Sequence, residues 1–106
     1  MQWIKIFGSS DEARARLPEN HPQLLLVDGK RICLAHRQGQ IFAVADRCTH
    51  QGDSLSRGQV NFLGEVICPW HGYRFDLRTG REANEQSPDL EIFPIREDAD
   101  GVFIAI

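Results

Sequence analysis

The sequence predicts an all-β fold, an antiparallel sandwich or small barrel, into which a subdomain of two loops is inserted. Three observations predict it: short runs of β-type residues, turn dipeptides at regular spacing, and a stretch at about 46–72 that is richer in Cys, His and Gly. The length of 106 residues is typical of a single domain, so we expect one domain over 1–106 with the inserted subdomain at about 46–72.

The first elements are a strand and a short helical turn. Trp3–Phe7 is predicted as a strand, and residues 9–17 as one short helical turn with Ser10 as its N-cap. Pro18 and Pro22 follow directly, and proline cannot continue a helix. The helix is therefore expected to be brief.

A three-stranded meander comes next, with strands at Gln23–Val27, Arg31–His36 and Ile41–Ala45. Asp28-Gly29 joins the first two runs and is a strong hairpin signal, and Gly39 marks the next turn. The remaining strands are predicted beside the turn residues Thr79-Gly80 and Asp100-Gly101, at Val66–Cys68, Tyr73–Leu77, Glu91–Arg96 and Val102–Ile106.

Two cysteine–histidine pairs stand in the inserted stretch. Cys48-Thr49-His50 is followed, after seventeen residues, by Cys68-Pro69-Trp70-His71. Each pair offers one thiolate and one imidazole to a metal centre. A structural zinc site with the same four donors is the alternative, although zinc motifs usually pair like ligands in C-x₂₋₄-C and H-x₃₋₅-H spacings.

These motifs resemble the Rieske ferredoxin family. The similarity includes Cys48–His50, Cys68–Asp76, Thr79-Gly80 and Leu90–Ile95, and it extends over essentially the whole chain. The resemblance implies a Rieske-type fold and one [2Fe–2S] cluster per chain, bound by Cys48, His50, Cys68 and His71. In such a centre two histidines replace two cysteines on one iron, and this raises the reduction potential because neutral imidazoles add no negative charge.

Four positions distinguish the chain from the respiratory, high-potential branch of this family. That branch has a disulfide where this chain has Asp53 and Trp70, and a serine and a tyrosine where it has Tyr73 and Phe75. The serine and tyrosine donate hydrogen bonds that stabilise the reduced cluster. The sequence therefore resembles the ferredoxin branch and predicts a low potential.

The resemblance implies a one-electron carrier with no active site of its own. Its partners would be a ferredoxin reductase, flavin- and NAD(P)H-dependent, and a terminal oxygenase. The small subunit of a cytoplasmic NAD(P)H nitrite reductase is the alternative, because residues 74–80 resemble that group as well. A self-contained oxygenase is rejected. Its mononuclear iron needs two histidines and a carboxylate in a catalytic domain after the cluster loops, whereas the only other histidines, His21 and His36, both precede those loops.

Charge and hydropathy argue against nucleic acid and membranes as partners. The net charge of −3 disfavours nucleic acid, which favours a basic surface. The longest clean apolar run is Leu24–Val27, far below the roughly 20 residues of a membrane span, and the N-terminus lacks the pattern of a signal peptide. We therefore expect no membrane association and a cytoplasmic location.

Several neighbours of the predicted ligands have two interpretations. Gly52 and Gly72 either donate backbone N–H groups to cluster sulfur or are ordinary turn glycines. Ser87-Pro88 either forms a third loop over the cluster or is a surface turn, and Cys33 is expected in the core. The exposed rim of the centre is expected to consist of His50, Gln51, Gly52, Trp70, His71 and Pro88.

Overall fold

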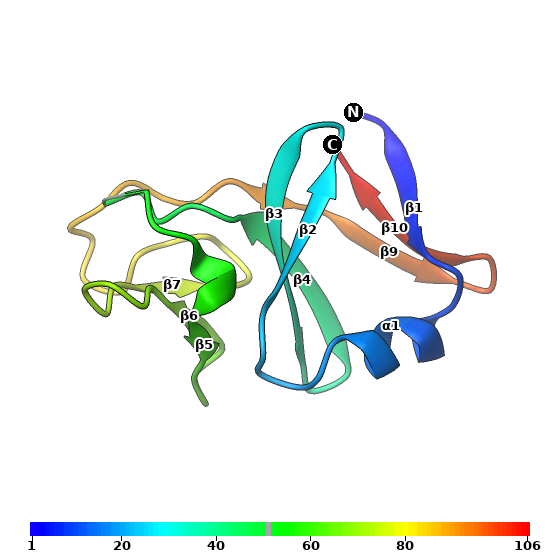
Figure 1. Ribbon diagram of the computed structural model, residues 1–106, viewed down its shortest axis with the longest axis horizontal. Coiled ribbons are helices and arrows are strands. Elements are labelled where there is room, and N and C mark those ends of the chain that lie inside the picture. Colours follow the sequence, from blue (N-terminus) through cyan, green and yellow to red (C-terminus); the bar gives the residue numbers. More distant parts are fainter. Residues whose placement is uncertain (51) are drawn as a thin grey trace.

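The computed structural model describes residues 1–50 and 52–106, and most of its elements are short strands. In chain order these are β1 (Trp3–Phe7), α1 (Ser10–Arg16), β2 (Gln23–Val27), β3 (Lys30–Arg37), β4 (Gln40–Ala45), the 3₁₀ turn η1 (Leu55–Arg57), β5 (Gln59–Val60), β6 (Glu65–Ile67), β7 (Arg74–Asp76), β8 (Ile92–Phe93), β9 (Ile95–Asp98) and β10 (Gly101–Ala105). They form three antiparallel sheets with the orders β1-β10-β9, β2-β3-β4-β8 and β5-β6-β7 (Figure 1). The all-β prediction is confirmed, and no sheet of the described residues closes into a barrel.

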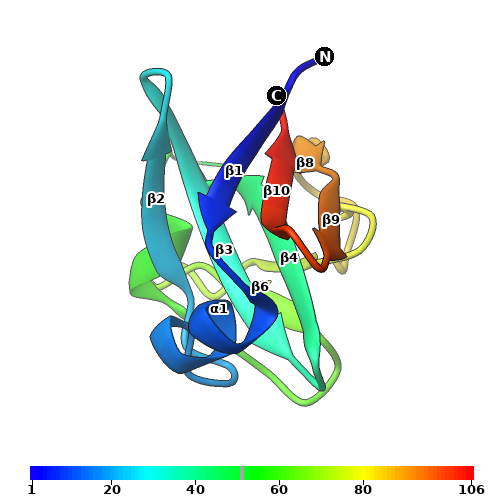
Figure 2. The same cartoon turned by 90° about the vertical axis from the view of Figure 1, so that its right-hand side faces the viewer.

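The sheets β1-β10-β9 and β2-β3-β4-β8 pack around a first core. Figure 2 shows β1 and β10 in front of β3 and β4. The buried side chains of this core come from both sheets and from α1: Phe7, Ala13, Leu17, Val27, Ile32, Leu34, Ile41, Ala43, Phe93, Val102 and Ile104. Apolar area removed from water stabilises this sandwich at roughly 25 cal/mol per Å².

A second core lies under the small sheet β5-β6-β7, and both cysteines of the paired motif belong to it. Its buried side chains are Cys33, Ala35, Val44, Cys48, Leu55, Val60, Val66, Cys68, Phe75, Leu77 and Leu90. Successive residues of a strand point to opposite faces, so β3 supplies Ile32 and Leu34 to the first core and Cys33 and Ala35 to the second. The strand β3 is therefore the common wall of the two regions, and the expectation that Cys33 is buried is confirmed.

The hairpin turns of the meander have the predicted form. Asp28 and Gly29 have φ angles of 48° and 77°, and Gln38 and Gly39 have 52° and 81°. A type I′ turn requires positive φ at both central residues, which Gly adopts without steric cost. Both turns therefore join their strands as the sequence indicates.

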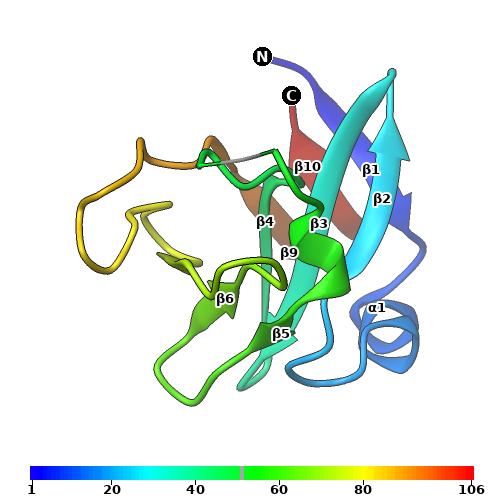
Figure 3. The same ribbon diagram turned by 60° about the vertical axis from the view of Figure 1, so that its left-hand side comes forward.

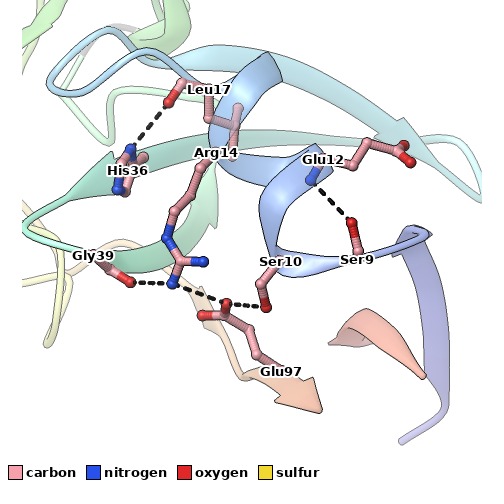
Figure 4. Close-up of polar contacts among 8 residues, drawn as sticks. All are labelled: Ser9, Ser10, Glu12, Arg14, Leu17, His36, Gly39 and Glu97. Atoms are coloured by element: carbon pink, nitrogen blue, oxygen red, sulfur yellow. Dashed lines mark hydrogen bonds and ion pairs between the residues drawn. The ribbon is translucent and has the colours of Figure 1, made fainter. Parts of the chain in front are cut away.

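The N-cap of helix α1 lies one residue earlier than predicted. Ser9, not Ser10, is the N-cap, since its hydroxyl accepts the Glu12 N–H at 3.0 Å. Ser10 instead donates its hydroxyl to Glu97 at 2.8 Å (Figure 4). Two adjacent serines are equally good caps, so sequence could not choose between them. None of the helices in the described ranges has the length and hydropathy of a membrane span.

The predicted strand Glu91–Arg96 is wrong as a single element. Pro94 divides it into β8, which pairs with β4, and β9, which pairs with β10. Proline has no N–H for a ladder, so the chain leaves one sheet at this point and joins the other. The other predicted strands differ from the observed ones by at most one residue at each end. The sequence did not predict η1 or β5.

Candidate metal centre

The two cysteine–histidine loops close in the same way. The Cys48 N–H donates to the Asp53 carbonyl at 2.8 Å, and the Cys68 N–H donates to the Tyr73 carbonyl at 2.7 Å. Each cysteine carbonyl in turn accepts from the glycine four residues later, Gly52 at 2.7 Å and Gly72 at 3.0 Å. Both ends of each cysteine's backbone are therefore fixed within its own loop.

These bonds decide between the two interpretations of the glycines. Gly52 and Gly72 have φ angles of 77° and 73°, a left-handed conformation that side-chain-bearing residues rarely adopt. Their N–H groups already donate to the carbonyls of Cys48 and Cys68. They serve as turn glycines that close the loops, and their amides are engaged there.

The two thiols lie together below the surface. Cys48 and Cys68 are 1% and 2% exposed, and the Cys48 thiol lies near enough to that of Cys68 to affect its pKa. Burial raises the pKa of the Cys68 thiol, backbone N–H groups of Trp70 and His71 oppose that rise, and Cys48 adds to it. Two thiols and two amides thus face the same small volume.

The two imidazoles lie together at the surface. The ring centroids of His50 and His71 are 5.5 Å apart with an interplanar angle of 56°, and both residues are exposed. Tyr73 stacks on His50 with centroids 4.2 Å apart and planes at 12°. Trp70 is tilted at 42° against His71 at 5.6 Å. Both rings therefore have an aromatic neighbour from the second loop.

A third segment is bonded to the first loop. The Thr49 hydroxyl has one proton, which it donates to the Pro88 carbonyl at 2.6 Å, so it accepts from the Ser87 hydroxyl at 2.5 Å. Figure 3 shows this part of the chain from the side of the loops. Ser87-Pro88 therefore lies beside the first loop, as the third-loop interpretation requires.

Two buried carboxylates support these segments, and the sequence analysis did not single them out. Asp46 accepts from the Ser54 hydroxyl and from the Ser56 N–H at 2.6 Å, and it is 3.5 Å from Arg31. Glu82 accepts the Asn84 and Gln86 N–H groups at 2.9 and 2.7 Å. In the sequence both resemble ordinary surface acids. The position of Asp46, two residues before Cys48, is the one signal that could have pointed to a role in the site.

Most residues of the predicted rim lie at the surface. Of the expected rim, the residues His50, Gly52, Trp70, His71 and Pro88 are exposed, and Gln51 lies outside the described residues. His36 is half-buried, and its Nδ1 lies 3.1 Å from the Leu17 carbonyl (Figure 4).

The donor set fits a two-iron cluster better than a single ion. A [2Fe–2S] centre of the Rieske type takes two cysteines on one iron and two histidines on the other, so its donors separate into like pairs. The structure shows such pairs, with the thiols buried and the imidazoles exposed. Within residues 1–50 and 52–106, no three His, Cys, Asp or Glu side chains converge on one point as ligands of one ion would.

Comparison with known proteins gives the same result. The family model described as "Rieske [2Fe-2S] domain" matches residues 3–94. The ferredoxin subunit of a 3-phenylpropionate/cinnamic acid dioxygenase from Photorhabdus laumondii is 36% identical over 76 residues, which are 71% of this chain and 72% of the relative.

Two solved structures share the fold. The ferredoxin in a complex of reduced oxygenase and oxidised ferredoxin of carbazole 1,9a-dioxygenase is 26% identical, with a TM-score of 0.81 over 97% of this chain and 92% of that one. A chain from Mycobacterium tuberculosis, assigned as an NADH-dependent nitrite reductase small subunit, is 22% identical, with a TM-score of 0.83 over 99% and 95%. The family match and the dioxygenase relative both cover most of the chain, which therefore belongs to the Rieske [2Fe–2S] domain family and has a [2Fe–2S] cluster as its cofactor.

Proposed function

We propose that the protein passes single electrons from a ferredoxin reductase, flavin- and NAD(P)H-dependent, to a terminal oxygenase, with its cluster bound by Cys48, His50, Cys68 and His71. The observation that supports it most strongly is the arrangement of the donors, two buried thiols behind two exposed imidazoles. Such an arrangement binds a redox group firmly and leaves one side of it at the surface.

The residues of the chain have separate tasks in this proposal. The thiols of Cys48 and Cys68 would hold the inner side, and the N–H groups of Trp70 and His71 would stabilise negative charge on sulfur. The imidazoles of His50 and His71 would hold the outer side and form the exit toward a partner. When bound, the cluster supplies a one-electron redox couple.

The partners are inferred from the relatives. The Photorhabdus relative is a dioxygenase ferredoxin subunit, and the carbazole ferredoxin is found in complex with its oxygenase. The nitrite reductase alternative rests on a likeness at 22% identity, which indicates the fold alone. Mixing the reduced protein with each purified acceptor separates them, and we expect reoxidation by a dioxygenase component and none by nitrite reductase.

The proposal also includes the domain organisation, the cellular location and the site of catalysis. We propose a single domain over 1–106, in which the subdomain at about 46–72 binds the cluster and residues 73–90 support it from the second core. The protein would be cytoplasmic and would have no active site, so catalysis would take place on the oxygenase.

Cofactor analysis tests the ligands directly. The purified protein should be red-brown, contain two irons and two sulfides, and show an EPR signal of average g below the free-electron value when reduced. Replacing either histidine by Ala should abolish that signature. A colourless protein with stoichiometric zinc after anaerobic reconstitution would refute the proposal.

The reduction potential tests the assignment to the ferredoxin branch. We expect a value at or below roughly 0 mV, near the bottom of the Rieske range, because Phe75 has no hydroxyl to donate. Phe75 is fully buried, and Phe75→Tyr should raise the potential, because the added hydroxyl can donate to cluster sulfur. Voltammetry of the wild type well above about +100 mV contradicts the assignment.

Docking is expected at the exposed end of the centre. Trp70 is 66% exposed beside His71, and a surface depression of about 450 Å³ borders His50, with Arg47 and Glu91 among its lining residues. Charges of both signs and an aromatic anchor favour a small interface with modest salt dependence. Trp70→Ser should slow electron delivery and leave the visible spectrum unchanged, whereas Asp100→Lys in the β9–β10 turn should change neither the delivery rate nor the spectrum.

A further inference from the structure

Tyr73 makes the closest ring contact in the metal centre. Its ring lies 4.2 Å from that of His50, centroid to centroid, with the planes only 12° apart. Tyr73 ends the second loop, whereas His50 belongs to the first, so the stack joins the two loops through their side chains. The Tyr73 carbonyl also accepts the Cys68 N–H at 2.7 Å, so the backbone beneath the ring is fixed.

Tyr73 stands directly after Gly72, at the position where the high-potential branch has a serine. In the structure it is the ring of Tyr73 that faces the imidazole of His50. The contact that Tyr73 makes is therefore made by its ring.

The two imidazoles are constrained to different degrees. His71 contacts Trp70 at a 42° tilt and 5.6 Å, and Trp70 is itself 66% exposed. His50 contacts a half-buried tyrosine in a near-parallel stack, which restricts rotation of the ring about its Cβ–Cγ bond. His50 is exposed overall, and Tyr73 is its nearer and more nearly parallel ring neighbour, since the His71 ring is 5.5 Å away and tilted by 56°.

We propose that Tyr73 is a positioning residue, whose ring fixes the plane of the His50 imidazole and thereby binds the first loop to the second. This inference rests on the proposed function, in which His50 is a cluster ligand. It assigns the effect to the aromatic ring and none to the hydroxyl.

Two substitutions separate the ring from the hydroxyl. Tyr73→Phe retains the stack and removes the oxygen, and Tyr73→Leu removes the stack. With the purified holoprotein, excess EDTA should bleach the visible absorbance of Tyr73→Phe at the wild-type rate. Bleaching of Tyr73→Leu should be roughly 2- to 12-fold faster, the factor that corresponds to the stabilisation measured for aromatic pairs. Phe62→Leu, at an 82% exposed position in the β5–β6 turn, is the control for loss of an aromatic ring in the same region, and it should bleach at the wild-type rate.

A spectroscopic measurement locates the effect on one imidazole. Pulsed EPR of the reduced protein resolves nitrogen couplings from two histidines. In Tyr73→Leu the couplings of one histidine should shift or broaden and those of the other should stay, because the stack involves His50 and not His71. Tyr73→Phe should retain both sets.

The outcomes distinguish this inference from the ligand assignment. Absence of histidine couplings in the wild type would refute the assignment of His50 and His71. Couplings in the wild type together with faster bleaching in Tyr73→Phe would overturn the inference, since the hydroxyl would then be responsible. Wild-type behaviour of Tyr73→Leu would overturn it as well, and a Leu variant that assembles no cluster beside a fully loaded Phe variant supports it.

Discussion

The sandwich and the metal-binding region of this chain are stabilised by different interactions. The sandwich has strands of four to eight residues apart from β8, and its core is made of apolar side chains. The metal-binding region has strands of two or three residues, and its loops are fixed by buried carboxylates and by cysteine backbones bonded within their own loops. The comparison indicates that the sandwich is stable through its own core, whereas the loops depend on polar contacts and on the cluster.

The strand β3 connects the two regions. Ile32 and Cys33 are adjacent in the chain and both fully buried, yet they belong to different cores. Damage to the loops should therefore reach β3 from one face only. Hydrogen exchange and unfolding of variants in each region can test this difference.

The largest effect should come from removing a proposed ligand. His71→Ala should lose the cluster, because metal-binding free energy contributes directly to folding where the site is not preformed. Amide exchange in residues 52–72 should become roughly 100-fold faster or more through local opening, while β1 and β10 keep their protection. Equal loss of protection in both regions would show that they fold as one unit.

A smaller effect should follow from removing the buried carboxylate before the first loop. Asp46→Ala should lower the free energy of unfolding by about 3 kcal/mol, because the Ser54 hydroxyl and Ser56 N–H lose a charged acceptor. The Arg31 pair adds little to this value, since that arginine is 56% exposed. Chemical unfolding measures it, with the exposed Asp100→Ala as the control expected within about 0.5 kcal/mol of the wild type.

The thiol of Cys33 should make stability depend on pH. Burial, and secondarily Asp46, raise its pKa in the folded state, so the folded protein keeps the proton while the unfolded chain loses it above about pH 8.5. This stabilisation is complete below that pH and is lost as pH rises, by about 2 kcal/mol between pH 8 and 10. The contribution of Cys33 is the difference between the wild type and Cys33→Ala in how the free energy of unfolding changes with pH. Identical pH dependence of the two proteins would contradict this prediction.

The smallest effect should come from the edge of the sandwich. Glu97 accepts from Ser10 and lies 3.5 Å from Arg14, in contacts that are partly exposed (Figure 4). Glu97→Gln should therefore reduce the free energy of unfolding by at most about 1 kcal/mol, and 1 M NaCl should largely remove the difference. A larger loss would mean that α1 depends on polar contacts as the loops do.

The sequence was a good guide to the sandwich and a partial guide to the site. Trp3–Phe7 and Gln23–Val27 are confirmed to the residue, because apolar runs and an Asp-Gly turn define their ends. The strand Glu91–Arg96 was wrong since one missing N–H at Pro94 outweighs a favourable pattern. Two-residue strands such as β5 carry no periodicity at all.

Within the site, residue types were predictable and supporting contacts were not. The paired motif gives the four proposed ligands, and the structure brings thiols and imidazoles together as pairs. The roles of Asp46 and Glu82 depend on burial, which a lone acidic residue does not indicate. The stack of Tyr73 on His50 depends on how two loops meet, which is a tertiary property.

The closure of the two cysteine loops has a consequence for the speed of electron exchange. Every electron that arrives or leaves changes the local charge, and atoms that shift in response add a reorganisation barrier to the transfer. Here Cys48 and Cys68 are buried, and each has its N–H and its carbonyl bonded within its own loop. The surroundings of the sulfur atoms should therefore change little on transfer, which favours rapid exchange in both directions at a small driving force.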